Sequence, residues 1–163
     1  MEEKLSYKDE EMLKIVPKNK KGVCLYSGGK DSGLALSIAC ENSEIVALIN
    51  CCEKKHPMFH QHNTDLMELQ SESLGIPLIY SEGHWKESIE IEDILRELKN
   101  KGIEFVVFGD ICSTKNANRK IKLCEKVGLI PCMPLWNKTY EWLYLEMKKR
   151  KLKGYVLPTL YLL

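Results

Sequence analysis

The sequence has no stretch approaching the roughly 20 consecutive apolar residues that a helix needs to span a bilayer. Its first residues, Met-Glu-Glu-Lys, lack the basic start and the apolar core of a signal peptide. An excess of one charge sign is also missing, because 24 Lys and Arg stand against 23 Asp and Glu, so a broad polyanion-binding surface is not expected. We therefore expect a cytoplasmic protein without a membrane partner, and the 163 residues (1–163) predict a single domain.

Paired cysteine motifs are a further absence. No Cys-x-x-Cys spacing occurs among the seven cysteines and their number is odd, so the sequence indicates no disulfide framework. Cys24 and Cys40 fall on predicted core elements, where a thiol acts as a small apolar group. Cys51 and Cys52 raise a zinc hypothesis, but zinc sites usually show two paired ligand motifs, and reduced structural thiols are the favoured interpretation. The histidines that suggest zinc are His56, His60 and His62.

What is present is an alternation of apolar runs and amphipathic segments. The continuous apolar runs Ile45–Ile49 and Phe105–Phe108 are typical of strands that are covered on both faces. Strands alternating with helices predict an α/β fold, a Rossmann-like three-layer α/β/α sandwich around a mostly parallel five-stranded sheet. Residues 1–20 are expected to form an N-terminal helical extension.

The individual elements follow from the same pattern. Strands are predicted over Gly22–Tyr26, Glu44–Asn50, Pro77–Tyr80, Glu104–Phe108 and Gly154–Leu157. Helices are predicted over Tyr7–Val16, Ser32–Glu41, His62–Leu74, Lys86–Lys101, Asn116–Val127 and Thr139–Lys151. Gly75, Gly102 and Gly128 stand where three of these helices need a left-handed terminating residue.

A short loop, Ser27-Gly28-Gly29-Lys30-Asp31-Ser32, joins the first predicted strand to the next helix. Glycines allow close backbone approach, and loop amides and a helix N-terminus direct partial positive charge at an anion. The two serine hydroxyls add donors, and the lysine adds a full charge. The spacing differs from a Walker A motif, since an aspartate follows Gly-Lys. We interpret the loop as a phosphate site rather than a plain turn.

Polar residues follow other predicted strands at what should be the same rim of the sheet, where ligands of such sheets bind. Asn50 ends the second strand, and Gly109, Asp110 and Ser113 follow the fourth. Arg119, on the next helix, either pairs with Glu125 or binds phosphate. In the loop itself, Asp31 either supports the helix N-terminus or holds Mg²⁺. Trp136 is interpreted as a packing residue.

The loop Ser27–Ser32 resembles the signature loop of the N-type ATP pyrophosphatases, the adenine nucleotide alpha-hydrolase-like group with a HUP-type fold. Within that group the chain is most similar to the diphthine–ammonia ligase family. The segments that carry this resemblance are Met58-Phe-His60 with Asn63, Gln70-Ser-Glu-Ser-Leu-Gly-Ile-Pro77, Phe108-Gly-Asp-Ile-Cys-Ser113, Arg119 and Pro134-Leu-Trp136. They cover roughly residues 22–136. The chain is shorter than the family, has no Glu-Gly-Gly segment, and has Thr114–Asn118 in place of a Tyr-Gln pair.

The resemblance implies an AMP-forming, ATP-dependent amide ligase with ATP and Mg²⁺ as cofactors. It implies that Ser27, Gly28, Gly29, Lys30 and Ser32 hold the departing pyrophosphate and that Asp31 lies at the metal. It further implies that the backbone near Asn50 meets adenine and ribose, while Gly109, Asp110, Ser113 and Arg119 face the phosphates or the acyl substrate.

The partners implied are an acyl acceptor such as elongation factor 2 and an ammonia donor. Apart from the resemblance, we consider a homodimer, in which a second copy of the chain is the partner. Two alternatives remain open: a module that binds ATP or AMP without turnover, and a thiolation enzyme with Cys51, Cys52 or Cys112 as nucleophile.

Overall fold

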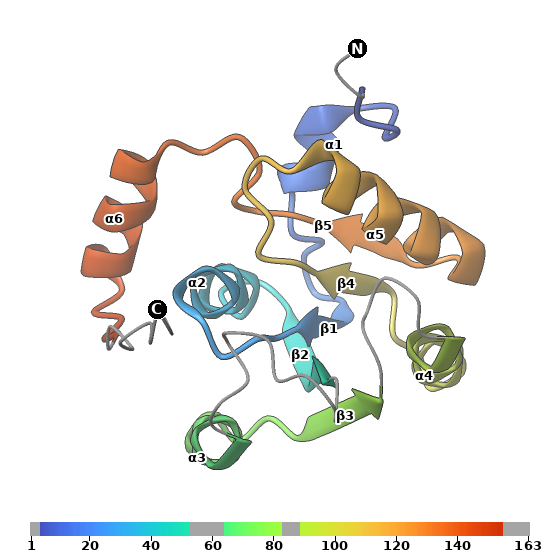
Figure 1. Ribbon diagram of the computed structural model, residues 1–163, viewed down its shortest axis with the longest axis horizontal. Helices are drawn as coiled ribbons and strands as arrows, with labels where there is room; N and C mark the ends of the chain where they lie inside the picture. Colours follow the sequence, from blue (N-terminus) through green and yellow to red (C-terminus); the bar gives the residue numbers. More distant parts are fainter. Residues whose placement is uncertain (1–3, 53–63, 83–88, 155–163) are drawn as a thin grey trace, which may run out of the picture.

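The computed structural model describes residues 4–52, 64–82 and 89–154. Their centre is a five-stranded sheet in the order β3-β2-β1-β4-β5, in which every neighbouring pair is parallel (Figure 1). The predicted parallel α/β sheet is therefore confirmed. The strands are β1 (Lys21–Leu25), β2 (Glu44–Cys52), β3 (Leu78–Glu82), β4 (Phe105–Val107) and β5 (Ile130–Cys132).

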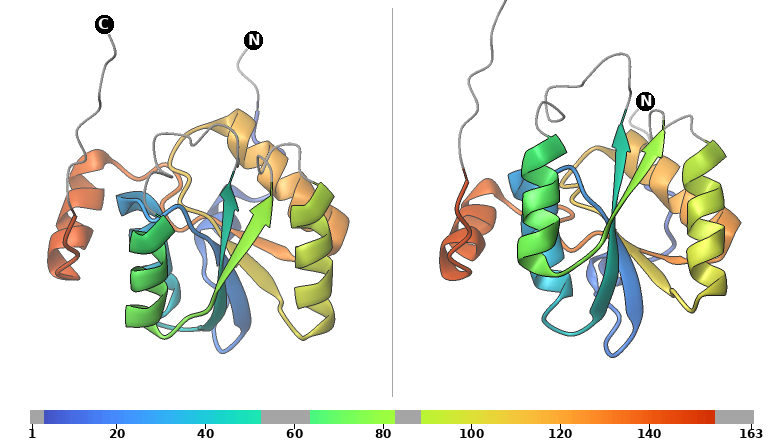
Figure 2. Two further views of the ribbon diagram at one scale, coloured as in Figure 1. Left: turned by 60° about the horizontal axis from the view of Figure 1, so that its bottom comes forward. Right: turned by 90° about the horizontal axis from the view of Figure 1, so that it is seen from below.

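Helices cover both faces of the sheet and complete three layers (Figures 1 and 2). One apolar cluster joins the sheet to α2, α3 and α6, and the other joins it to α1, α4 and α5. Successive strand residues such as Val23 and Cys24 point to opposite clusters, as the pleat of a strand requires. The helices are α1 (Glu10–Lys14), α2 (Lys30–Ala39), α3 (Thr64–Leu74), α4 (Ile89–Asn100), α5 (Thr114–Val127) and α6 (Tyr140–Lys149).

The strand order reverses between β1 and β4, which pair in parallel although they are distant in sequence. Chain segments leave these two strands toward opposite faces of the sheet, so a crevice forms beyond their carboxyl ends, where ligands of open α/β sheets bind. Gly22 of β1 lies under the ring of Phe105 from β4, so that a Cβ atom there would stand 2.4 Å from the ring. A side chain at Gly22 would therefore displace this ring from between the paired strands β1 and β4.

The fifth strand lies elsewhere than predicted. The observed fifth strand is β5, Ile130–Cys132, whereas the predicted one was Gly154–Leu157. Gly154 lies in no strand, and residues 155–157 fall outside the described residues. A three-residue strand containing Pro131 gives a weak sequence signal, because proline cannot donate to a strand ladder. Proline is tolerated here because, among the described strands, β5 lies at the edge of the sheet and pairs with β4 alone.

Helix types were predicted correctly, with shifted ends. The first helix is shorter than expected, and α2 and α5 begin two residues earlier than predicted. Gly75, Gly102 and Gly128 all have positive φ, as expected of helix-terminating glycines. One core assignment was wrong: Cys24 is buried, but Cys40 follows the last residue of α2 and is exposed.

The N-terminal segment packs on the edge of the sheet beside β5. Leu13 is fully buried in the core cluster, and its carbonyl oxygen accepts a hydrogen bond from the Met133 amide at 2.7 Å. The Asn118 side chain of α5 holds the start of this segment, accepting from the Ser6 amide at 2.7 Å and donating to the Lys4 carbonyl at 2.9 Å. The predicted N-terminal extension therefore contributes directly to the core.

Candidate functional site

The loop Ser27–Ser32 is stabilised by hydrogen bonds to its own serine hydroxyl groups. The Ser27 amide donates to Ser32 Oγ at 3.3 Å, and the two serine hydroxyls lie 3.1 Å apart. Ser32 Oγ also donates to the Gly29 carbonyl at 3.0 Å, and the Gly29 amide approaches Ser27 Oγ at 3.4 Å. Gly28 has φ of 75°, a left-handed conformation that favours glycine. The loop thus has a defined curvature set by local contacts.

Several amides of this loop remain available. In the described part of the chain, the amides of Gly28, Lys30, Asp31 and Ser32 form no hydrogen bond. The last three are the first amides of α2, whose N-terminus carries partial positive charge. Amides at a helix N-terminus are typical donors to a bound phosphate, so the loop stays a candidate phosphate site.

The two charged residues of the loop pair with each other. Lys30 Nζ lies 2.7 and 2.9 Å from the carboxylate oxygens of Asp31. Both side chains reach solvent, so the pair contributes little to stability. Asp31 lies in the first turn of α2, where its charge complements the helix dipole, but the N-cap is Gly29, without a side-chain cap. Lys30 can therefore exchange its partner for a phosphate at small cost.

Gly109 brings the end of β4 against the start of α2. A Cβ atom on Gly109 would lie 2.8 Å from the Ser32 amide nitrogen and 2.9 Å from the Asp31 carbonyl carbon. Only glycine fits at this distance without a shift of backbone. The predicted site residues Gly109, Asp31 and Ser32 are thus in contact, although the sequence reasoning had no means of showing how closely.

Asp110 forms a nearly buried ion pair with Lys120 of α5. Lys120 Nζ lies 2.5 Å from Asp110 Oδ2, and the two side chains are only 12% and 9% exposed. The same ammonium lies 5.3 Å from the centroid of the Phe108 ring, within range of a cation–π contact. Sequence reasoning missed Lys120. Its spacing of ten residues from Asp110 crosses a loop and the first turns of a helix, so only the fold reveals the pair.

Asn50 and Tyr26 support the entry to the loop. The buried Asn50 side chain donates from Nδ2 to the Tyr26 carbonyl at 2.8 Å. The Tyr26 hydroxyl donates to Gln70 Oε1 of α3 at 3.0 Å, and burial raises the pKa of this phenol, which keeps the proton available. Gln70 and Met67 also pack beside Gly28. Asn50 thus lies at the predicted rim, where its side chain fixes the first strand.

Two further predicted residues, Ser113 and Arg119, lie at the start of α5 and within it. Ser113 is the exposed N-cap of α5 and makes no side-chain cap. Arg119 is exposed and pairs with no other residue in the described ranges, so the expected alternative of an ion pair with Glu125 is not found there. Trp136 is buried in the core, as expected of a packing residue.

The thiols divide into buried and accessible groups. Burial raises the pKa of the Cys132 thiol to about 12 and raises the pKa of Cys24 and Cys124 as well, so these three stay protonated. Of the three candidate nucleophiles, Cys112 is exposed at the rim and Cys51 is half-buried, while the Cys52 side chain lies outside the described part. His56, His60 and His62 lie outside it too. Residues 4–52, 64–82 and 89–154 contain no cluster of three or more potential metal ligands.

A comparison with protein families identifies the chain. The model of the diphthamide synthase N-terminal domain matches residues 20–131, which include the loop, Gly109, Asp110 and Arg119. The chain belongs to this family. Its recognition as an ATP pyrophosphatase-like protein is thereby confirmed.

Two relatives of this diphthamide synthase N-terminal domain are both named diphthine–ammonia ligase. The chain is 28% identical over 152 residues to a diphthine–ammonia ligase of Saccharomyces cerevisiae, covering 78% of this chain and 22% of the relative. It is 25% identical over 158 residues to a diphthine–ammonia ligase of Mus musculus, covering 82% of this chain and 59% of the relative. The chain thus spans less than two thirds of the length of either relative.

Solved structures confirm the fold of the diphthamide synthase N-terminal domain. The U34-tRNA thiolase NcsA from Methanococcus maripaludis superimposes with a TM-score of 0.51 at 16% identity, over 94% of this chain and 62% of that one. A predicted subunit of a tRNA methyltransferase from Methanocaldococcus jannaschii superimposes with a TM-score of 0.50 at 16% identity. The match covers 78% of this chain and 74% of that one. At this identity the likeness concerns the fold alone.

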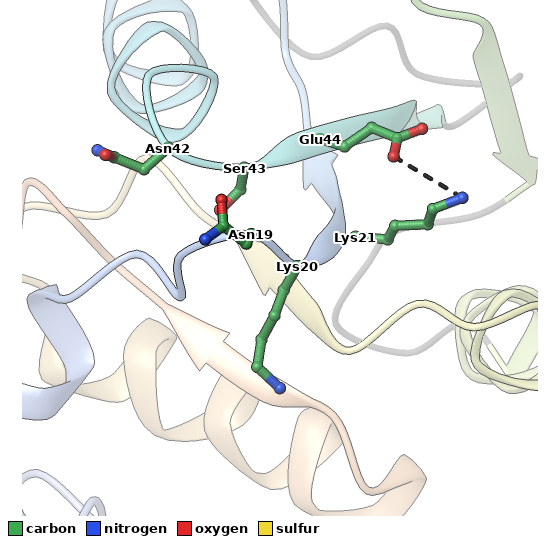
Figure 3. A pocket seen from close by; sticks show the side chains of 6 residues that line it. All are labelled: Asn19, Lys20, Lys21, Asn42, Ser43 and Glu44. Atoms are coloured by element: carbon green, nitrogen blue, oxygen red, sulfur yellow. Dashed lines mark ion pairs between the residues drawn. The ribbon is translucent and has the colours of Figure 1, made fainter.

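A hollow of about 290 Å³ lies at the opposite end of the sheet, at the amino ends of β1 and β2 (Figure 3). Its two lysines are already neutralised, since Lys21 lies 3.7 Å from Glu44 and Lys20 pairs with Glu104. It also lies away from the rim where polar residues converge, so it is not the candidate site. The helices of the described part include none that is long and apolar enough to cross a membrane.

Proposed function

We propose that the chain binds ATP through the loop Ser27–Ser32 and uses it to activate an acyl oxygen. The observation that carries this proposal is the set of four amides without acceptors among the described residues, next to two hydroxyls and Lys30. These groups lie at the reversal of strand order, where ligands of such sheets bind. Membership of the diphthamide synthase N-terminal domain family supports it.

The proposed reaction has two displacements. A carboxylate oxygen of the acceptor attacks the α-phosphorus of ATP, the bond to the bridging oxygen breaks, and pyrophosphate leaves. Ammonia then attacks the acyl carbon, AMP leaves with the acyl oxygen, and the ammonium intermediate loses a proton to solvent. The loop amides and Lys30 act in the first step, because they stabilise the charge that develops on the departing pyrophosphate. Positioning contributes the rest, and the chain needs no covalent nucleophile.

Mg²⁺ fits this arrangement through Asp31. Magnesium in nucleotide sites is commonly held by one or two carboxylates together with phosphate oxygens, so a single carboxylate beside the loop is an adequate protein contribution. The Asp31 side chain is about one-third exposed, and its carboxylate lies beside the ammonium group of Lys30. When bound, the ion would supply charge neutralisation at the leaving phosphates.

The acceptor is proposed from the relatives, which are diphthine–ammonia ligases. By that analogy the substrate is a carboxylate on a protein such as elongation factor 2, and ammonia comes from solution or from a donor protein. The Asn50 backbone would meet adenine and ribose. Asp110, Ser113 and Arg119 would face the phosphates or the acyl group, with exposed Arg119 as the available cation.

Product analysis with MgATP tests the proposal. We expect MgATP to raise the Tm of the chain and, with acceptor and ammonia present, to yield AMP and pyrophosphate in equal amounts. Formation of ADP and phosphate would overturn the mechanism. Tight ATP binding without any product under these conditions would support a nucleotide-binding module in its place.

A further inference from the structure

Helix α6 presents an unpartnered face at the outside of the molecule. It lies beyond α2, away from the sheet, as Figures 1 and 2 show. Its inner side is fixed by the buried Leu143 and by Arg150, which pairs with Glu41 at the end of α2 at 2.6 Å. On the outer side, Tyr140 is 75% exposed, Tyr144 64% and Leu145 55%.

The outer residues form one regular stripe. They are Tyr140, Glu141, Tyr144, Leu145, Lys148 and Lys149, and all six are exposed, while the other residues of α6 are buried or half-buried. At 3.6 residues per turn, Glu141 and Lys148 lie on the midline of this stripe, with Tyr144 and Leu145 to either side. Within the described part of the chain, neither Glu141 nor Lys148 forms an ion pair.

This stripe is complementary to itself under a two-fold rotation. Glu141 and Lys148 are equally far from the midpoint of Tyr140–Lys149, which falls between Tyr144 and Leu145. In an antiparallel pair of α6 helices, Glu141 of each copy therefore lies opposite Lys148 of the other copy, which gives two such contacts. Tyr144 meets Tyr144 and Leu145 meets Leu145 near the axis. Such an isologous match gives a closed dimer.

We propose that the outer face of α6 is the contact between two copies of this chain in an antiparallel, two-fold dimer. The proposal is independent of the proposed reaction. Tyrosine is enriched in protein interfaces, and the opposite charges along the midline would fix the antiparallel register of the two helices. One helix per copy buries less than the roughly 800 Å² per partner of a standard interface, so we expect a dimer that dissociates on dilution.

Charge exchange tests the contact directly. Sedimentation velocity of the full chain, from low micromolar to near-millimolar concentration, should show a monomer–dimer equilibrium. Glu141→Lys alone places lysines opposite each other, and Lys148→Glu alone places glutamates opposite each other, so each should weaken the dimer at least tenfold. The double variant E141K/K148E restores opposite charges and should restore the dimer. Circular dichroism should remain unchanged, because both side chains are exposed.

Two results would overturn the proposal. The first is a wild-type chain that stays monomeric at every concentration, which would leave the face to residues 155–163 of the same chain or to a different partner. The second is a dimer that both single variants and the double variant leave equally strong, which would place the interface elsewhere.

Discussion

At the scale of single residues, the site depends on a few atoms that have no substitute. Gly28 has a left-handed backbone, and Gly109 lies against the backbone of α2 with no room for a side chain. Lys30 is the one residue of the loop that adds a full positive charge. Gly28 thus sets the curvature of the loop, Gly109 allows β4 to approach α2 closely, and Lys30 supplies the positive charge.

Replacing Lys30 by alanine should weaken ATP binding without changing the fold. A hydrogen bond to a charged group contributes about 1.5–3 kcal/mol, which corresponds to a fall in affinity of about 10- to 150-fold. Calorimetric titration with MgATP measures this. Lys21→Ala, at the far end of β1, is the matched control and should bind like the wild type. Equal affinity of the Lys30 variant and the wild type would contradict the assignment of the loop.

Replacing Gly109 by alanine should destabilise the chain and weaken ATP binding together. The new methyl group would meet the Ser32 amide at 2.8 Å, and overpacking of this kind costs about 1–3 kcal/mol. Gly33→Ala is the control, because Gly33 lies in α2 with no atom near its missing Cβ. It should instead stabilise by about 0.5–1 kcal/mol. Urea unfolding distinguishes the two, and equal stability of both variants would refute the close contact.

At the scale of elements, the join between β4 and α5 determines where the predicted site residues point. Asp110 leaves the end of β4 and Lys120 lies on α5, and their ion pair spans the turn between the two elements. Because both side chains are about nine-tenths buried, losing one partner leaves the other charge buried without its ion-pair partner. The pair therefore fixes the loop that contains Gly109.

Removing one member of this pair should be more harmful than removing both. Asp110→Asn or Lys120→Met alone should lower the free energy of unfolding by about 3–5 kcal/mol, since a buried charge then loses its ion-pair partner. The double variant should lose clearly less. Urea unfolding of the four proteins completes a double-mutant cycle. Additive losses would show that the two groups do not interact in solution.

Sequence reasoning predicted what is local and missed what depends on tertiary contacts. The loop Ser27–Ser32 was found because its glycines, hydroxyls and lysine are adjacent in the sequence. The edge strand β5 was missed because three residues with a proline carry little signal. Lys120 was missed because its partner lies across a turn. The contact of Gly109 with α2 depends on β1 and β4 being neighbours, which no local pattern contains.

At the scale of the whole molecule, segments outside the matched family region close the core. Residues before the match, which begins at residue 20, include the fully buried Leu13. Residues after it include Met133, whose amide donates to the Leu13 carbonyl. The two flanking segments thus meet beside β5, and the matched region does not supply the entire core.

Truncating Leu13 should therefore destabilise the whole chain. Its side chain has no exposed surface, and Leu→Ala in such a position costs about 2–5 kcal/mol. Met12→Ala is the matched control, because Met12 is 54% exposed and should change stability by less than about 0.5 kcal/mol. Thermal and urea unfolding measure both. Similar stability of the two variants would show that the N-terminal segment is detached in solution.

The pairing of β1 with β4 has a consequence for synthesis on the ribosome. The loop Ser27–Ser32 emerges early, whereas Gly109 and its strand emerge only after more than half of the chain has been made. A nascent chain arrested before β4 contains every residue of the loop but lacks the strand that positions it. Nucleotide capture should therefore begin late in translation, and bound nucleotide would report that the central strands have come together.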